Sequence, residues 1–389
     1  MKKIGIITGT RAEYGLLKPI IGKVNESDSM ELQLVVTGMH LSPEFGLTYQ
    51  EIEQDGYPIT AKIEMLLSSD TSVGITKSMG LAMISFADYY EAYKPDIVII
   101  LGDRYEMLAA ASAAMIAKVP IAHIHGGELT EGLIDEAIRH SITKMSYLHF
   151  ATTATYRKRI IQLGEEPERV YNVGALGVES IKQLKLLKKK KLEDKINFSF
   201  SEKTIMVTYH PVTLDMMSSE QQFRNLLEVI DKHKELQVIF TKANADTDGR
   251  IINQLIDSYV KENSERCVAF TSMGQLKYLS ALQYCCGVVG NSSSGLIEVP
   301  SFHIPTVNVG ERQRGRVMAD SVICCKNDVQ DIEKAFTKML SEDFQKIALN
   351  VVNPYEGKDT SDRIIDIIQK ALKDGIDIKK KFYDMRVTK

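Results

Sequence analysis

Acidic and histidine side chains in the first half of the chain could transfer protons. They follow short apolar runs such as Ile97-Val98-Ile99-Ile100-Leu101, or open a stretch with helical spacing, where a carboxylate suits the positive end of the helix dipole. Several carboxylates at one edge of a sheet raise the chance that one has a pKa suited to acid or base work. The candidates are Asp103, His125, Glu128 and Asp135.

The second half offers groups that bind phosphate. The segment Gly290-Asn291-Ser292-Ser293-Ser294-Gly295 joins an apolar run to a short helical pattern, and its hydroxyl and N–H groups could cradle a diphosphate. The glycine spacing is that of a Walker loop, but Leu296 and Ile297 stand where lysine and a hydroxyl residue are required. An NTPase loop is therefore excluded. Glu298, one turn on, is placed to accept hydrogen bonds from ribose hydroxyls.

Other residues just after apolar runs could bind the same ligand. Arg11 lies in the turn from Thr8 to Gly15, where a guanidinium and the N–H groups of a helix start can hold a phosphate. The turn lacks the GxGxxG fingerprint, so a nicotinamide cofactor is unsupported. Further candidate contacts are His210, Asn244 and Arg312.

A metal site is the main alternative chemistry for the first half. His123 and His125 are two residues apart on an expected strand and so share a face, with Glu128 nearby, a set that could hold a hydrolytic metal. The position at a sheet end and the phosphate-type loops of the second half argue against it. We expect no metal and no redox cofactor.

Apolar runs rich in β-branched residues alternate with helical patterns along the chain. This alternation predicts βαβ units and parallel sheets, in which ligands bind beyond the carboxyl ends of the strands. Helical spacing is clear at 108–117, 134–145 and 361–372. Strands are expected at 4–8, 32–37, 97–101, 121–124, 148–152, 204–208, 238–241, 268–271, 287–290 and 305–309.

The length of 389 residues suits two domains. A lysine-rich stretch at 181–203 predicts a solvated helix and linker, so we expect an N-terminal domain at 1–180 and a C-terminal domain at 181–372. Residues 373–389 form a polar tail, which we expect to be mobile from Lys379 onward. The fold class is α/β, with two Rossmann-like domains.

Composition argues against several kinds of partner. A net charge of −3 gives no general attraction to nucleic acid or to a membrane. Five cysteines without CxxC spacing suit a reducing compartment, and the N-terminal apolar stretch is too short for a signal peptide or a membrane span. We expect a cytoplasmic protein that binds neither nucleic acid nor membrane.

Taken together, these segments resemble the hydrolysing UDP-N-acetylglucosamine 2-epimerases, above all the bacterial members of the sialic-acid pathway. The resemblance covers nearly the whole chain, and the combination and order of the motifs make it specific. The matching elements are ITGTRAEYG, VTGMH, LGDRYE, HIHGGE, DEAIRHSITKMS, NAD, GNSSSGLIEVPS and the segment 310–316.

The resemblance implies a glycosyltransferase-B-type fold with a central cleft, a last helix that crosses back to the first domain, and a homodimer or dimer of dimers. The family removes UDP by anti elimination across C1–C2 of UDP-N-acetylglucosamine. Water then adds to the 2-acetamidoglucal and gives N-acetylmannosamine, a step in sialic acid biosynthesis. The C2 proton is not acidic, so a carboxylate must act as base while the C1–O bond stretches.

The resemblance also assigns roles to residues. Asp103 and Asp135 match the catalytic carboxylates of the family, and Glu298 matches its ribose contact. The diphosphate contacts match Arg11, His210, Ser292, Ser293 and Gly295, and further ligand-facing positions match Arg104, Asn244 and Arg312.

Two points stay open from the sequence. Many relatives have a catalytic glutamate where this chain has His125, although the sialic-pathway subgroup resembles this chain there; either His125 or Glu128 therefore transfers the proton. The sugar is the second point, since relatives in the legionaminic-acid pathway use a UDP-2,4-diacetamido-2,4,6-trideoxyglucose. A non-hydrolysing epimerase, which would return a UDP-sugar, is the further alternative.

Overall fold

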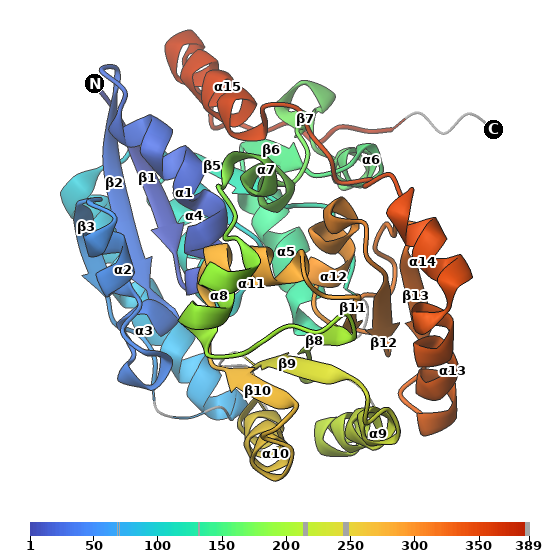
Figure 1. Ribbon diagram of the computed structural model, residues 1–389. Coiled ribbons are helices and arrows are strands. Elements are labelled where there is room, and N and C mark those ends of the chain that lie inside the picture. Colours follow the sequence, from blue (N-terminus) through green and yellow to red (C-terminus); the bar gives the residue numbers. More distant parts are fainter. Residues whose placement is uncertain (68, 70, 131–132, 213–216, 244–248, 386–389) are drawn as a thin grey trace. The chain divides into compact units, whose positions relative to one another are not determined.

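A computed structural model describes residues 1–389 except 68, 70, 131–132, 213–216, 244–248 and 386–389. The chain forms two compact units, whose elements are labelled in Figure 1. Unit 1 consists of Met1–Glu128, Asp135–Ser180 and Tyr355–Lys389, and unit 2 of Leu129–Ile134 and Ile181–Pro354. The C-terminal segment thus belongs to unit 1, and a short segment after Glu128 groups with unit 2.

Unit 1 is built on a seven-stranded sheet in which all pairings are parallel. Its strands are β1 (Lys2–Thr8), β2 (Met30–Thr37), β3 (Ile59–Ile63), β4 (Ile97–Leu101), β5 (Ile121–Ile124), β6 (Leu148–Ala151) and β7 (Val170–Asn172). The order β3-β2-β1-β4-β5-β6-β7 is that of a doubly wound Rossmann-like domain, with the switch point between β1 and β4.

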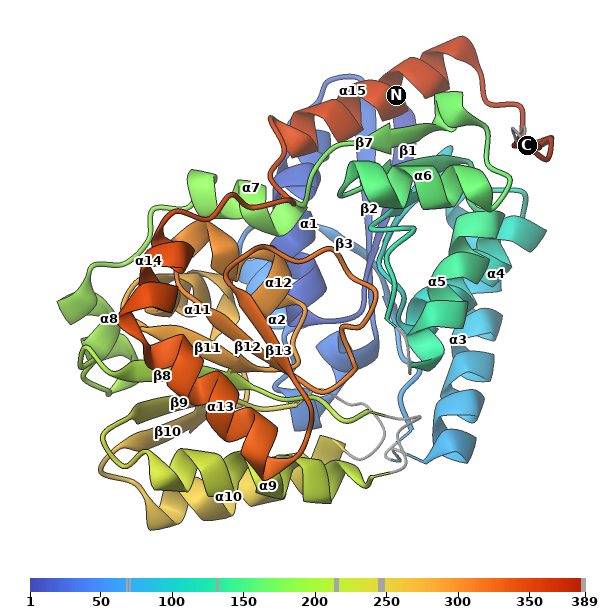
Figure 2. The ribbon, with the colours of Figure 1, turned by 90° about the vertical axis from the view of Figure 1, so that its right-hand side faces the viewer.

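Helices cover both faces of this sheet. They are α1 (Arg11–Asn25), α2 (Tyr49–Gln54), α3 (Ser72–Tyr93), α4 (Tyr105–Ile116), α5 (Ile134–Met145), α6 (Ala154–Gln162), α7 (Leu176–Gln183) and α15 (Thr360–Asp374), with 3₁₀ turns η1 (Gly38–Leu41), η2 (Pro43–Phe45) and η3 (Pro167–Arg169). Figure 2 shows α3, α4 and α5 along one side of the sheet.

Alternate residues of the central strands enter two separate cores. Ile4 and Ile6 pack in a cluster with apolar residues of α1 and α15, whereas Ile7 packs in another with those of α3 and α4. Side chains of a strand alternate between faces, so burial of both faces requires a continuous apolar run. The five-residue run Ile97–Leu101 is buried throughout for this reason.

Unit 2 repeats the plan with a six-stranded parallel sheet. Its strands are β8 (Thr204–Thr208), β9 (Gln237–Thr241), β10 (Cys267–Phe270), β11 (Gly287–Gly290), β12 (Thr306–Val309) and β13 (Val322–Cys325), in the order β10-β9-β8-β11-β12-β13. Its helices are α8 (Lys189–Ile196), α9 (Ser219–Lys232), α10 (Gly249–Glu262), α11 (Gly274–Leu282), α12 (Ser294–Ile297), α13 (Val329–Leu340) and α14 (Glu342–Leu349), with the 3₁₀ turn η4 (Val299–Phe302).

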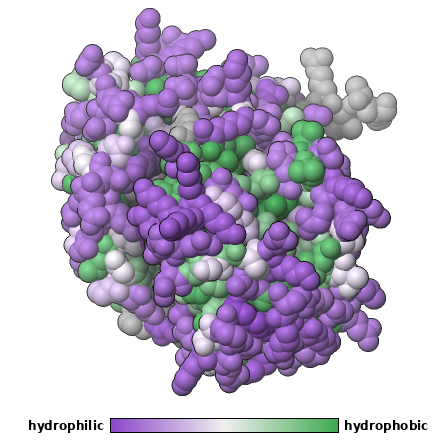
Figure 3. Space-filling view, viewed as in Figure 1, coloured by the Kyte–Doolittle hydropathy of each residue, from purple (hydrophilic) through white to green (hydrophobic). Residues whose placement is uncertain are grey.

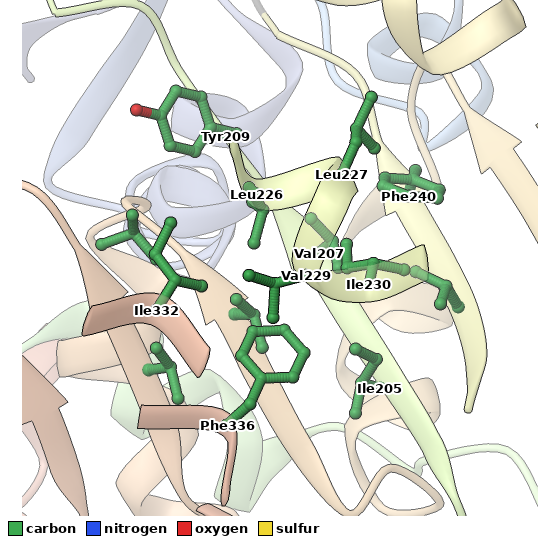
Figure 4. Close-up of a cluster of buried hydrophobic side chains, with 14 of the residues drawn as sticks. Ile205, Val207, Tyr209, Leu226, Leu227, Val229, Ile230, Phe240, Ile332 and Phe336 are labelled. Carbon is green, nitrogen blue, oxygen red and sulfur yellow. The ribbon is translucent and has the colours of Figure 1, made fainter. Parts of the chain in front are cut away.

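The main core of unit 2 lies between its sheet and the helices α9, α10 and α13. Ile205 and Val207 of β8 pack with Ile332 and Phe336 of α13, as Figure 4 shows. The intervening Met206 points to the opposite face, where a second cluster includes buried residues of α8. The same alternation therefore builds both units.

Three strands were not predicted from the sequence, and all of them lie at sheet edges. They are β3, β7 and β13. An edge strand pairs on one side only and is less buried, so it needs no continuous apolar run. In β3, for example, only Ile63 is buried.

The lysine-rich stretch contains a helix with a solvated face, as expected, whereas the tail does not behave as expected. The stretch includes α8, whose Leu192 and Ile196 are buried while Lys189 and Lys190 are exposed. The tail was expected to be mobile, but its described part is attached to unit 1. Lys380 donates to the backbone oxygen of Ser146 at 2.6 Å, and further bonds are described below.

Polar and charged residues cover most of the face seen in Figure 3. Among the described residues, no helix is both long and apolar enough to cross a membrane.

Candidate active site

Arg11 opens the helix that follows β1. Thr10 caps α1, since its hydroxyl accepts from the backbone N–H of Glu13 at 3.2 Å. The Glu13 carboxylate in turn accepts from the N–H groups of Gly9 and Thr10 at 2.7 and 3.2 Å. This capping box fixes the turn. The guanidinium of Arg11 pairs with the carboxylate of Glu51.

Asp103 lies just after β4 and is bound by a buried arginine that the sequence analysis did not single out. The guanidinium of Arg139, 1% exposed, pairs with Asp103. It also donates to Glu136 Oε2 at 2.8 Å and to the backbone oxygen of Glu128 at 2.9 Å. Burial alone would lower the pKa of Arg139, but the neighbouring acidic groups raise it above its usual value. One permanent cation thus ties together the end of β4, the segment after β5 and the start of α5.

Asp135 lies in the first turn of α5, one turn before Arg139. It is next to Glu136, whose second oxygen is 3.0 Å from His140 Nε2. Two carboxylates suit this position because the helix N-terminus carries partial positive charge. The structure therefore places Asp135 beside the acidic network around Arg139.

His125 and Glu128 form a pair after β5. His125 Nδ1 lies 3.6 Å from Glu128 Oε1, and the carboxylate also accepts from the Thr152 hydroxyl at 3.2 Å. His125 is a non-glycine residue with a φ of 68°, a sparsely populated conformation that clusters at functional sites. Glu128 is 2% exposed and His125 12%, so the histidine is the more accessible of the two.

His123 has a structural role that removes it from the metal alternative. Its Nε2 is 2.8 Å from the backbone oxygen of Gly102, so Nε2 carries the proton. Its Nδ1 is 3.2 Å from the Thr143 hydroxyl, and burial lowers its pKa to about 3. Both ring nitrogens are thus engaged by the protein. Within the described residues, no group of three His, Cys, Asp or Glu could hold a metal ion.

The serine-rich loop of unit 2 joins β11 to α12. Gly290 has a φ of 136°, and a Cβ there would lie 1.9 Å from the backbone oxygen of Thr208, so the position requires glycine. Ser293 is the N-cap residue of α12, and the hydroxyl of Ser292 accepts from the N–H of Ser294 at 3.4 Å. The hydroxyls and the helix start thus lie where the sequence predicts them. Gly295 is within α12 and Glu298 follows it.

Asn291, which was not assigned a role from the sequence, joins three segments of unit 2. Its side chain bonds both backbone polar groups of His210, at 2.7 and 2.8 Å. Its backbone oxygen accepts from Arg312 at 3.1 Å and from the buried Gln313 at 2.7 Å. The structure therefore brings His210 and Arg312 to the serine-rich loop. Asn244 lies outside the described residues.

A sequence signal existed for both missed residues. Arg139 is one turn after the acidic pair that opens α5, a spacing at which side chains on a helix meet. Asn291 is an amide directly after a strand, at the ligand-binding edge of the sheet. Neither signal identifies the partner, because the contacts span 36 and 81 residues.

Comparison with known proteins identifies the family of the chain. A family profile described as UDP-N-acetylglucosamine 2-epimerase matches residues 22–369. The chain is 44% identical over 89% of its length, and 89% of the relative, to GDP/UDP-N,N'-diacetylbacillosamine 2-epimerase (hydrolyzing) of Campylobacter jejuni. It is 39% identical over 99% of its length, and 98% of the relative, to polysialic acid biosynthesis protein P7 of Escherichia coli.

The fold is that of solved structures from the same group. The crystal structure of UDP-GlcNAc 2-epimerase from Neisseria meningitidis bound to UDP-GlcNAc superposes with a TM-score of 0.79 at 19% identity, covering 95% of this chain and 100% of the other. The expectation of two Rossmann-like domains of glycosyltransferase-B type is confirmed. The chain belongs to the UDP-N-acetylglucosamine 2-epimerase family.

Proposed function

We propose that the chain is a hydrolysing UDP-sugar 2-epimerase that releases UDP and a free 2-acetamido sugar. The observation that carries the proposal is the network around Arg139, which fixes Asp103, Glu136 and the backbone of Glu128 at the carboxyl ends of β4 and β5. A fixed guanidinium beside these carboxylates holds the candidate proton acceptors in position. No metal or redox cofactor is required by this chemistry.

The reaction divides into an elimination and a hydration. In the first step a carboxylate, Asp103 or Asp135, removes the C2 proton; the C2–H electrons form the C1–C2 double bond, and the C1–O bond breaks with departure of UDP. In the second step water adds its hydroxyl to C1 and a proton returns to C2. Inversion at C2 requires the proton to return from the other face, so a second proton-transfer group is needed.

We assign this second group to His125 and a positioning role to Glu128. A histidine can carry a proton near neutral pH, and Glu128 Oε1 lies 3.6 Å from His125 Nδ1, within reach to orient the ring. The near-complete burial of Glu128 and its bond from Thr152 suit a residue that orients its neighbour. The sequence alone left the choice between these two residues open.

The UDP portion is assigned to unit 2. His210, Ser292, Ser293, Gly295 and Arg312 are proposed diphosphate contacts, and Glu298 the ribose contact, with Arg11 and Arg104 of unit 1 as further ligand contacts. Prearranged donors around a leaving group supply a large share of catalysis, since they stabilise charge as it develops. Asn244 is retained as a candidate on the family motif alone.

For the sugar we favour UDP-N,N'-diacetylbacillosamine, a 2,4-diacetamido-2,4,6-trideoxyglucose nucleotide. The C. jejuni relative at 44% identity is named for the GDP- or UDP-linked form of this sugar, and a Legionella pneumophila relative at 34% identity for the UDP-linked form. UDP-N-acetylglucosamine, with N-acetylmannosamine as product, is the second candidate, favoured by the E. coli polysialic acid protein at 39% identity.

A homodimer is part of the proposal, and we assign its interface to exposed apolar residues of unit 1. Val73, Leu81 and Ile84 of α3 and Ile116 of α4 are 43–75% exposed, and the two helices pack together. Neighbouring exposed apolar residues mark interaction sites. Ile84→Lys with Ile116→Lys should convert a dimer to a monomer in light scattering; a wild-type monomer would contradict the proposal.

The test of function is a comparison of substrates. Purified protein is incubated separately with UDP-N,N'-diacetylbacillosamine and UDP-N-acetylglucosamine, and UDP and free sugar are followed by NMR. We expect equal amounts of UDP and a C2-inverted free sugar, with the higher kcat/KM for the diacetamido substrate. Turnover of neither nucleotide would refute the proposal.

A further inference from the structure

Two buried carboxyl groups and one guanidinium lie beside the turn after β1. Glu106, in the first turn of α4, is 1% exposed and accepts from Arg104 Nε at 2.7 Å. Glu13, in the first turn of α1, is buried and accepts only backbone N–H bonds among the contacts described above. The described residues give Glu13 no salt bridge within 4.0 Å.

Gly9 shows how closely the two acids approach the same turn. The N–H of Gly9 donates to Glu13 Oε2 at 2.7 Å. A Cβ on Gly9 would lie 2.7 Å from Glu106 Oε1 and 2.9 Å from its Cγ, closer than real Cβ contacts allow. The glycine is therefore enclosed by Glu13 on one side and Glu106 on another.

The charges of these three side chains do not balance if both acids are ionised. Two carboxylates would face a single guanidinium, and an uncompensated buried anion costs several kcal/mol. Arg104 Nε donates to Glu106 Oε1 at 2.7 Å, so Glu106 is the carboxyl group that the guanidinium pairs with directly. The Oε2 atom of Glu106 is buried and has no hydrogen-bond partner among the described residues, so it could accept a bond from a nearby donor.

We propose that Glu13 is the neutral member and Glu106 the anionic member of a buried acid pair, and that the two act as positioning residues for Arg11 and Arg104. A proton on Glu13 removes the negative charge of its carboxylate, so one guanidinium is enough to balance the pair. Glu13 then holds the turn that leads to Arg11, and Glu106 holds the guanidinium of Arg104. The benefit to substrate binding rests on the proposed function, but the protonation states do not.

The electrostatic surroundings support this division. Burial, followed by the negative charge of Glu106, raises the pKa of Glu13 from 4.5 to about 8, although Arg104 and the two backbone bonds act in the opposite direction. His40 of η1 also lies at the turn, and its backbone N–H donates to the Gly9 oxygen at 3.3 Å. Burial lowers the pKa of His40 to about 4, so it adds no positive charge at neutral pH.

The stability of the protein should reflect the raised pKa. A folded-state pKa above the unfolded value means that the folded protein binds the proton more tightly, so the stabilisation is complete below about pH 4.5 and is lost as pH rises through about 8. Glu13→Gln keeps an oxygen acceptor for Gly9 and cannot ionise. It should therefore remove that loss between pH 5 and pH 9.

The experiment combines infrared spectroscopy with two matched variants. The wild type at pH 7 should show a protonated carboxylic-acid band that disappears in Glu13→Gln and persists in Glu106→Gln. Thermal unfolding of the same three proteins from pH 5 to pH 9 should show the flattened profile in Glu13→Gln only. Glu106→Gln should also raise the KM for the UDP-sugar at least tenfold, because Arg104 loses its anchor.

Each contrary result overturns a defined part of the proposal. A band lost in Glu106→Gln but kept in Glu13→Gln would reverse the assignment, and no band affected by either substitution would show that both acids are ionised. An unchanged KM in a folded Glu106→Gln protein would end the positioning role. The spectroscopic and stability results need no substrate, so they stand even if the proposed activity fails.

Discussion

Asn291 and His210 are joined by two reciprocal hydrogen bonds. Asn291 Oδ1 accepts from the N–H of His210 at 2.7 Å, and Nδ2 donates to its backbone oxygen at 2.8 Å. The Asn291 side chain thus satisfies both backbone polar groups of a residue that follows β8. Through this pair the candidate phosphate ligand His210 is held to the serine-rich loop.

Asn291→Ala should weaken UDP binding at least tenfold, because His210 loses its anchor and two buried backbone groups lose partners. Each unsatisfied group costs about 1–3 kcal/mol, so the melting temperature should also fall. Calorimetric titration with UDP measures the affinity, and Asn350→Ala, an exposed asparagine of the same unit, is the control. A double variant with His210→Ala should be less than additive. If the effects of the two substitutions on UDP affinity were fully additive, the two residues would act independently.

Asp103→Asn and Asp135→Asn should each lower kcat about 10²-fold or more, since each keeps the size of the side chain and removes the base. The affinity for UDP, assigned to unit 2, should change little. Steady-state kinetics with Asp88→Asn as an exposed control tests this. Turnover near that of the wild type in both variants would remove the carboxylates from the mechanism.

Activity should survive prolonged treatment with EDTA, because the proposed chemistry uses protein donors to stabilise the departing diphosphate. In the same assay His125→Ala should reduce kcat far more than Glu128→Gln, whose role is to orient the histidine. Loss of activity on chelation, with recovery on addition of zinc, would restore the metal alternative. Equal effects of the two substitutions would argue against the division of roles.

The tail should stabilise unit 1 through Lys380. Its ammonium is 2.6 Å from Glu165, which is also bonded by His149 at 2.9 Å and Lys144 at 2.6 Å. Burial alone would raise the pKa of Glu165, but the bonds and charges of His149, Lys144 and Lys380 lower it to about 2. A depressed carboxyl pKa stabilises the fold above about pH 4.5, and this contribution is lost as pH falls toward 2.

Lys380→Ala should therefore destabilise the protein at pH 7 by about 1–3 kcal/mol, and the difference from wild type should shrink below pH 4. Thermal unfolding between pH 2.5 and pH 7 measures both effects. Lys381→Ala, on an exposed neighbour, is the control. Identical curves for the two variants would mean that the tail contact is not formed in solution.

The central strands were predictable because burial on both faces requires a mostly apolar run. Ile97–Leu101, Ile121–Ile124, Thr204–Thr208 and Gly287–Gly290 have the bounds expected from the sequence. The edge strand β10 was predicted at 268–271, but the edge strands β3, β7 and β13 were missed, since exposure on one side permits mixed composition. The attachment of the tail was also missed, because one lysine in a polar stretch gives no local sign of its partner.

The candidate site follows the same division. The carboxyl ends of buried strands indicated where Asp103, His125 and the serine-rich loop would lie. The contacts that hold these residues could not be predicted from the local sequence, because Arg139 and Asn291 bond residues that are brought close only by the fold. Glu13 is the third such case, since its capping-box role is visible in the sequence but its neighbour Glu106 is 93 residues away.

The most direct test of hydrolytic 2-epimerisation is the reaction in D₂O with the better of the two UDP-sugars, followed by ¹H NMR and mass spectrometry. The account predicts one UDP for each free sugar, with inverted configuration and a single deuterium at C2, and no need for an acceptor sugar. A deuterated UDP-sugar with no free sugar would instead identify a non-hydrolysing epimerase. Free sugar without deuterium at C2 would show simple hydrolysis and contradict the elimination.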